Sequence, residues 1–338
     1  MFMLPSESGR FIADHMEHVS IHDNAIDNLA HFLCKQIDSN EYDIGKWKSE
    51  NRLHPQEAIP KAAEWIFIID SLNFSFWPDS GSEFTIEGEV GYWALCAAIN
   101  RALNDGIPIT DPNYCSQMTI EQAKHVFRTD QPNREIPMLH ERVQILNENG
   151  NILVQKFNST FVKCIQTANS SALALLRIVY ENFPSFRDEC QYKERNVTFL
   201  KRAQILIADL WACFEGQSLG RFDDIDQLTM FADYRIPQAL HHFGVLTYST
   251  ELMEQLQTNA LLMNGTQFEV EIRGASIHAV ELLRSRLKQL FDDKKIECNR
   301  NKLPNSIQID FYLWGYRRQN ANEIDRKSPY HKVRSLFY

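Results

Sequence analysis

One short segment combines four residue types that polar binding and catalytic sites use. Positions 231–238 read FADYRIPQ and bring together an acid, a phenol, a guanidinium and an amide: Asp233, Tyr234, Arg235 and Gln238. Asp233 also precedes Pro237 by four residues, which suits a helix N-cap or first-turn position, and Arg235 could form a surface ion pair. Spacing alone leaves the structural and the functional interpretation of this segment open.

A second candidate lies where an apolar stretch gives way to an aromatic loop, between Trp65 and Asp79. The Asp70 carboxylate and the Asn73 amide can bind the hydrogen-bonding edge of a flat base. Aromatic side chains can form the walls of a slot for that base, and the loop offers Phe74, Phe76 and Trp77. The alternative is core packing, with Asp70 as a helix-terminal residue.

A third segment, 201–211, places polar side chains at helical spacing. Arg202 and Asp209 are seven residues apart and share a helix face, and Lys201 lies near Gln204. The alternative is a solvated polar stripe opposite an apolar one.

The residues 329–338, PYHKVRSLFY, form a fourth candidate. His331 and Arg334 could bind a phosphate, but docking of this aromatic segment onto the body of the protein is the commoner explanation. The sequence contains no HExxH, P-loop or dinucleotide-binding GxGxxG motif.

Composition narrows the fold class and the partners. The chain has 338 residues, of which 44% are hydrophobic, and only 13 glycines and 12 prolines. This balance favours helices, and we expect a mainly α protein that forms one compact domain over residues 1–338 with a small β-hairpin. The net charge of −9 argues against nucleic acid as the main or stable partner but permits a small phosphorylated substrate.

The cysteines and the apolar stretches indicate where the protein works. The seven scattered cysteines contain no CxxC pair, so we do not expect a structural zinc site. An odd number of scattered cysteines is typical of a protein in a reducing compartment. No secretory signal or membrane-spanning apolar run is present, so no membrane association is expected. These features point to the cytoplasm or the nucleus and do not distinguish the two.

Apolar periodicity and capping signals predict the elements that must position these residues. Residues 74–86 contain Pro78, Gly81 and several serines, and we expect a loop or short hairpin there. The expected helices are 24–37, 58–72, 89–103, 119–127, 170–183, 199–214, 269–291 and 307–316.

Several strings along the chain resemble one known family. They are LNFSFWPD (72–79), GYWALCAAINRAL (91–103), KRAQILIADLWA (201–212), FADYRIPQAL (231–240) and PYHKVRSLFY (329–338). Together they resemble the queuosine salvage family of queuosine 5′-phosphate N-glycosylase/hydrolases. The tail departs from the more basic version expected for that family. The resemblance implies a single, mostly helical fold, similar in part to helix-hairpin-helix DNA glycosylases.

The resemblance also implies a reaction and its residues. The base of queuosine 5′-monophosphate would be released as queuine, without a metal or an organic cofactor, for use in tRNA modification. Asp233 would stabilise the cationic sugar, attack it or deprotonate water, as carboxylates do in glycoside hydrolysis. Asp70 and Asn73 would bind the base edge between the aromatic side chains. Lys201 would neutralise the phosphate or position Asp233, and Tyr234, Arg235 and Gln238 would hold sugar or phosphate.

Three other functions remain open. A noncatalytic binder of queuosine nucleotides or modified tRNA would share the pocket but lack turnover. A glycosylase acting on polynucleotide would show binding that depends steeply on salt. A helical scaffold would expose a large apolar patch. The sequence leaves three points open: the oligomeric state, the preference among nucleoside, monophosphate and longer fragment, and whether Asp233 attacks directly or through water.

Overall fold

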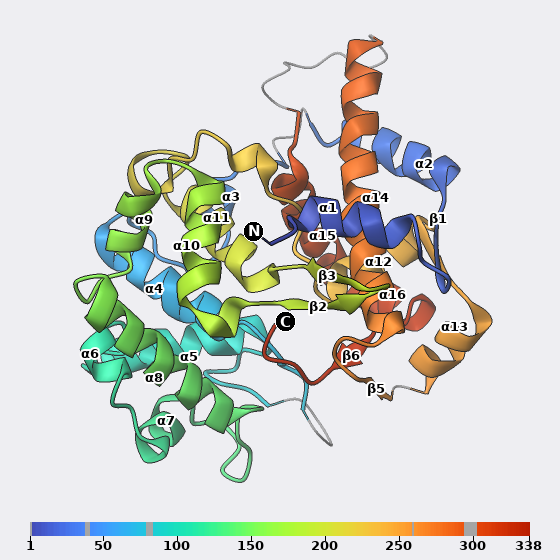
Figure 1. The fold of residues 1–338 in the computed structure, drawn as a ribbon. Coiled ribbons are helices and arrows are strands. Elements are labelled where there is room, and N and C mark those ends of the chain that lie inside the picture. Colours follow the sequence, from blue (N-terminus) through green and yellow to red (C-terminus); the bar gives the residue numbers. More distant parts are fainter. Residues whose placement is uncertain (1, 38–40, 79–83, 259, 294–302) are drawn as a thin grey trace. The chain divides into compact units, whose positions relative to one another are not determined.

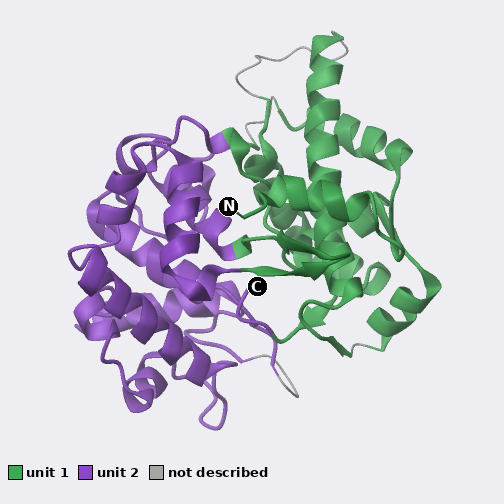
Figure 2. Ribbon diagram, in the orientation of Figure 1, with its two compact units in different colours: residues 1–43, 188–201, 226–334 green, residues 44–187, 202–225, 335–338 purple. Residues whose placement is uncertain are grey.

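A computed structural model describes residues 2–37, 41–78, 84–258, 260–293 and 303–338. Helices dominate it, which confirms the expected mainly α class. Asp79 and Cys298 lie outside the described residues. No helix in the described ranges is long and apolar enough to cross a membrane. The described residues form two compact units, coloured green and purple in Figure 2, each assembled from separated stretches of chain. The expectation of a single domain over residues 1–338 stays a prediction.

Unit 1 comprises residues 1–43, 188–201 and 226–334. Its core is the long helix α14, and both α1 and α2 pack against it (Figure 1). The elements of unit 1 are α1 (Pro5–Ala13), β1 (Val19–Ile21), α2 (Asp23–Cys34), β2 (Glu189–Tyr192), β3 (Arg195–Thr198), α12 (Arg235–His242), β4 (Leu246–Tyr248), α13 (Thr250–Gln257), β5 (Leu261–Leu262), α14 (Gln267–Asp292), α15 (Ser306–Gln319), α16 (Ala321–Lys327) and β6 (Lys332–Val333).

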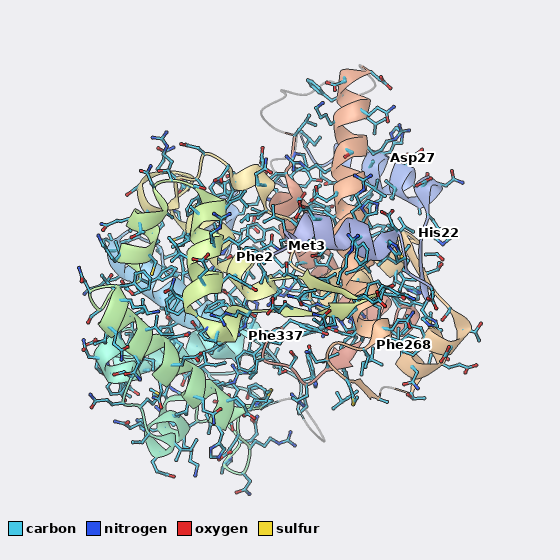
Figure 3. The ribbon with its side chains drawn as sticks, in the orientation of Figure 1. Phe2, Met3, His22, Asp27, Phe268 and Phe337 are labelled. Carbon is cyan, nitrogen blue, oxygen red and sulfur yellow. The ribbon has the colours of Figure 1, made fainter. Side chains whose placement is uncertain are left out.

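Side-chain contacts join α14 to the segment just before β1 and to α2. The Phe268 ring, labelled in Figure 3, meets the His18 ring edge to face, with 4.6 Å between the ring centroids. Asp27 of α2, also labelled, pairs with Arg286 of α14 at 2.7 Å. The strands of unit 1 form three two-stranded sheets: β1 with β4 and β2 with β3 are antiparallel, and β5 with β6 is parallel.

Unit 2 comprises residues 44–187, 202–225 and 335–338 and has no strand among its described residues. Pro60 opens α4 in its first turn, and Thr119 with Gln122 forms a capping box at the start of α7. The elements of unit 2 are α3 (Lys46–Ser49), α4 (Pro60–Ser71), α5 (Tyr92–Asn104), α6 (Pro112–Cys115), α7 (Ile120–Val126), α8 (Leu139–Lys156), α9 (Val162–Ala168), α10 (Ala172–Asn182), the 3₁₀ helices Pro184–Phe186 and Ser218–Gly220, and α11 (Lys201–Cys213), whose first residue belongs to unit 1.

The described part of 74–86 is a loop, with one isolated bridge between Ile86 and Glu89. The β-hairpin of the fold lies elsewhere, in β2 and β3. The expected likeness to helix-hairpin-helix DNA glycosylases stays a prediction.

The crossing of α1 and α14 is close because glycine faces it from both helices. A Cβ added to Gly274 would lie 2.5 Å from side-chain atoms of Ile12, and one added to Gly9 would lie 2.7 Å from Ile277. We therefore expect Gly274→Ala to lower the free energy of unfolding by about 1–3 kcal/mol, as overpacking of a core does. Urea denaturation measures this change.

Gly315 of α15 provides the matched control, because no atom would lie within 4 Å of its added Cβ. Gly315→Ala removes only the backbone freedom of glycine and should stabilise the protein by about 0.5–1 kcal/mol. Equal stabilisation by both substitutions would show that the crossing has room for a methyl group.

Candidate functional site

The Asp233 carboxylate is held at the start of α12. Its Oδ1 accepts the N–H groups of Arg235 at 2.8 Å and Ile236 at 2.9 Å, which confirms the capping interpretation. Its Oδ2 has no hydrogen-bond partner among the described residues, and the side chain is only half-buried. Capping therefore fixes the orientation of one oxygen and leaves the other available for chemistry, so the two interpretations of Asp233 are compatible.

A second carboxyl group, Asp310 of α15, lies beside this turn. It is buried, and its Oδ2 accepts the N–H of Phe231 at 2.9 Å. Burial raises the pKa of Asp310 well above its usual value, the charge of Asp233 raises it further, and Lys201 acts in the opposite direction. Lys201, Asp233 and Asp310 thus form one electrostatic group within unit 1, in which burial favours the neutral acid at Asp310.

This raised pKa predicts how Asp310 affects stability. An unfolded aspartate loses its proton near pH 4, whereas folded Asp310 keeps it to higher pH. The folded state then binds more protons than the unfolded state, so its stability falls as pH rises from about 4 through the folded pKa. Asp310→Asn keeps an acceptor for Phe231 and cannot ionise, so its stability relative to the wild type should increase over this range.

Urea denaturation at several pH values from 4 to 8 measures that difference. Asp223→Asn, a substitution at an exposed aspartate, is the control for the general effect of removing a carboxylate. A difference that varies with pH no more at Asp310 than at Asp223 would mean that the carboxyl of Asp310 titrates normally.

Lys201 is the first residue of α11 and is buried. Arg202, Gln204 and Asp209 of the same helix are buried too, so the interpretation of this segment as a solvated stripe is wrong. Within unit 2, Arg202 donates to the carbonyls of Ser71 and Ser185, and Asp209 accepts the indole N–H of Trp47 at 2.9 Å.

Arg235 is fixed from two sides. Its guanidinium lies 4.2 Å from the centroid of the Tyr330 ring and donates to the side-chain oxygen of Gln238 at 3.0 Å. The rings of Tyr234 and Tyr330 are 5.6 Å apart. Held in this way, Arg235 keeps a defined direction, as bidentate phosphate binding requires.

Gln238 is fully buried, and all its hydrogen-bonding positions are occupied. Its amide donates to Asp325 and to the carbonyl of Ser328, both at 2.8 Å, and its oxygen accepts from Arg235 and Arg317, both at 3.0 Å. It has no position left for a ligand, so the geometry assigns Gln238 to holding Arg235 rather than to binding substrate directly.

The predicted phosphate role of His331 has little electrostatic support. The side chain is buried, and burial, followed by the charge of Arg273, lowers the pKa of His331 to about 3. The imidazole is therefore neutral near pH 7 and supplies no positive charge to a phosphate. Arg334 is half-buried, and its phosphate role stays a prediction.

The described residues of the second candidate segment lie in unit 2 and contact one another there. Asn73 donates to Oδ1 of Asp70 at 3.3 Å, and both residues are buried. Phe74 is fully buried, with the guanidinium carbons of Arg142 and Arg202 at 4.3 and 5.2 Å from its ring centroid. These contacts give the packing interpretation of Phe74 a physical basis, and its stacking role stays a prediction.

Phe76 is half-buried, with Arg142 at 5.6 Å from its ring, and Trp77 is 8% exposed. The base-binding roles of Asp70, Asn73, Phe76 and Trp77 also stay predictions.

Sequence reasoning missed Asp310, Asp188 and Arg273. A signal existed for two of them, because Asp310 stands on the stripe of Ile307 and Leu313, and Arg273 on that of Val270 and Ile277. A charged residue at a core-facing helical position is rarely buried without a partner, so it marks a polar cluster. In the described ranges, no three His, Cys, Asp or Glu side chains are placed to hold a metal ion.

Comparison with known proteins adds a family match. The family model described as queuosine salvage protein matches residues 53–338. A protein of Nematostella vectensis is 45% identical over 346 residues, and one of Bos taurus is 42% identical over 341 residues. Each match covers 99% of this chain and 99% of the relative.

A bacterial protein, from Sphaerobacter thermophilus, is 37% identical and covers 97% of this chain and 96% of its own. All three relatives are named queuosine 5′-phosphate N-glycosylase/hydrolase.

Proposed function

This chain belongs to the queuosine salvage protein family, and we propose that it hydrolyses queuosine 5′-monophosphate to queuine and ribose 5-phosphate. The observation that carries the proposal is the match over nearly the whole chain to animal and bacterial relatives that bear this activity in their names. The geometry supports it with a half-buried carboxylate, Asp233, of which one oxygen is fixed and the other is free of hydrogen bonds to the described residues.

The reaction breaks the bond between C1′ of the ribose and the base nitrogen, and the bonding electrons leave with the base. Positive charge develops on the ribose, and a carboxylate can stabilise that charge. Water supplies a hydroxyl group to C1′ and a proton to the departing base. We assign Asp233 to the ribose, with Oδ2 as the oxygen that stabilises the cation, attacks it or deprotonates the water. The two backbone N–H groups that bind Oδ1 hold the Asp233 carboxylate in one orientation, so the side chain need not move during the reaction.

The leaving base is the difficult part of the reaction. Queuine is a 7-deaza base and lacks the ring nitrogen that is usually protonated when a purine is released. The base must therefore be stabilised through its other edge atoms, for which Asp70 and Asn73 are the candidates. In this proposal Arg235 binds the 5′-phosphate and Lys201 compensates nearby negative charge. The protein would act in the cytoplasm or nucleus, in keeping with the free thiols among its described cysteines.

The test is chromatographic detection of queuine after incubation of the purified protein with queuosine 5′-monophosphate, the nucleoside or queuosine-containing tRNA. We expect release from the monophosphate at least about tenfold faster than from the nucleoside, because one charge-assisted hydrogen bond to phosphate is worth about 1.5–3 kcal/mol. Arg235→Met should reduce the ratio of the release rate from the monophosphate to that from the nucleoside, because it removes the proposed phosphate ligand.

Other outcomes favour the rival functions. Tight binding of the nucleotide without release would indicate a noncatalytic binder. Preferred release from tRNA would indicate a polynucleotide glycosylase. If the protein neither binds the nucleotide nor releases queuine, the scaffold interpretation would remain.

A further inference from the structure

A buried cluster of charges lies in the core of unit 1. Arg273 of α14 forms a two-bond pair with Asp188, at 2.9 Å to Oδ1 and 2.5 Å to Oδ2, and also donates to Glu269 at 3.1 Å. The side chains of Arg273, Asp188 and Glu269 are at most 4% exposed. Burial of such charges is costly, and apolar replacements of buried ion clusters are often neutral or stabilising. Stability alone therefore explains this cluster poorly.

The cluster reaches the backbone next to Asp233. The remaining guanidinium nitrogen of Arg273, Nε, donates to the carbonyl of Ala232 at 2.8 Å. Ala232 immediately precedes Asp233, and the neighbouring Phe231 N–H is bound by Asp310 at 2.9 Å. The turn that carries Asp233 is therefore held at two consecutive residues by buried side chains from α14 and α15.

The same cluster reaches Lys201. Asp188 Oδ2, one of the two oxygens that accept from Arg273, also accepts the backbone N–H of Lys201 at 3.1 Å. The carbonyl of Asp188 accepts the N–H of Phe199 at 2.9 Å. Leu200, which lies between Phe199 and Lys201, has φ of 51°, an uncommon conformation for a residue other than glycine. The backbone that enters α11 at Lys201 is thus fixed in an otherwise unfavourable conformation.

We infer that Arg273 is a positioning residue for the reaction: it binds the Ala232 carbonyl directly and the Lys201 amide through Asp188, and so fixes Asp233 relative to Lys201. The inference rests on the proposed function. Arginine suits this task because its planar guanidinium donates to three partners at once: twice to Asp188, once to Glu269 and once to the Ala232 carbonyl. Lysine would keep the charge but could not reproduce this arrangement.

The first test is Arg273→Lys, with kcat and KM measured separately for queuosine 5′-monophosphate. Misplacement of a catalytic group by about 1 Å can lower the rate by about 10²-fold. We expect kcat to fall by about that factor while KM changes less than threefold. Arg286→Lys, on the same helix and also in an ion pair, is the matched control, because Arg286 stands 13 residues further along α14. Its kcat should stay within twofold of the wild type.

A second variant separates positioning from stability. Arg273→Met combined with Asp188→Asn and Glu269→Gln removes the charges of the cluster together. We expect this triple variant to recover most of the thermal stability lost by Arg273→Met alone, while kcat stays about 10²-fold below the wild type.

Recovery of kcat together with stability in the triple variant would show that the cluster is only structural and overturn the inference. Wild-type kcat in Arg273→Lys would overturn it as well. A wild-type protein that releases no queuine would instead refute the proposed function, and the inference would fail with it.

Discussion

Replacement of Asp233 by asparagine is expected to lower the rate of queuine release from queuosine 5′-monophosphate by about 10²–10⁴-fold, the range typical of losing a charged catalytic group. Asparagine keeps the size of the side chain and one amide oxygen, and it is as good a helix cap as aspartate. It can therefore still accept the N–H groups of Arg235 and Ile236, but it carries no negative charge for the ribose cation and cannot act as a base.

Chromatography of queuine in single-turnover reactions measures this rate, and thermal melting establishes that the variant is folded. Asp111→Asn is the matched control, because Asp111 also caps a helix, accepting the N–H of Asn113 at 2.8 Å. Its rate of release should not change. Undiminished release by Asp233→Asn would move the chemistry to another carboxyl, of which Asp310 and Asp70 are the candidates.

Arg142→Met is expected to destabilise the protein by about 3–5 kcal/mol, because three buried hydrogen bonds to a charged group are lost together. Arg142 has no exposed surface and donates to the carbonyls of Pro137, Leu72 and Phe74 at 2.9, 2.5 and 2.6 Å. Methionine is of similar length but leaves these carbonyls without that donor.

Urea denaturation gives the free energy of unfolding of this variant. Arg177→Met, at an exposed position of α10, should stay within about 0.5 kcal/mol of the wild type. A loss below about 1 kcal/mol at Arg142 would mean that water or rearranged groups satisfy the carbonyls. Because two of these carbonyls belong to the 72–74 segment, the same substitution tests whether Arg142 gives the aromatic loop its shape.

Local signals predicted much of the helical framework. The expected helix 58–72 is α4, 269–291 is α14, and 199–214 is α11, each shifted by at most a few residues. By contrast, α8 was missed, because its polar stretch with Glu148, Asn149, Gly150 and Asn151 hides the apolar stripe. The β2–β3 hairpin was also missed. It turns at Lys193 and Glu194, both with positive φ, where an Asn-Gly pair would have been the usual signal.

The site was predictable only where its residues stand close in sequence. The segment 231–238 could be identified from composition, and the capping role of Asp233 from its spacing to Pro237. Asp188 and Arg273, however, are 85 positions apart, and no periodicity links two residues on separate elements. The same holds for Asp310, which reaches Phe231 over 79 positions. Such pairs follow from tertiary packing, which single-sequence patterns do not contain.

The division of unit 1 into separated stretches has a consequence for its synthesis. Helix α1 is made early, but its partner α14 follows more than 250 residues later. At translation rates of about 5–20 residues per second, the interval is roughly 10–50 s. During that time the buried face of α1, which includes Gly9 and Ile12, has no α14 to cover it, whereas residues 44–187 of unit 2 emerge as one continuous stretch. Completion of unit 1, with its non-local contacts, is therefore expected to limit the rate at which the nascent chain matures.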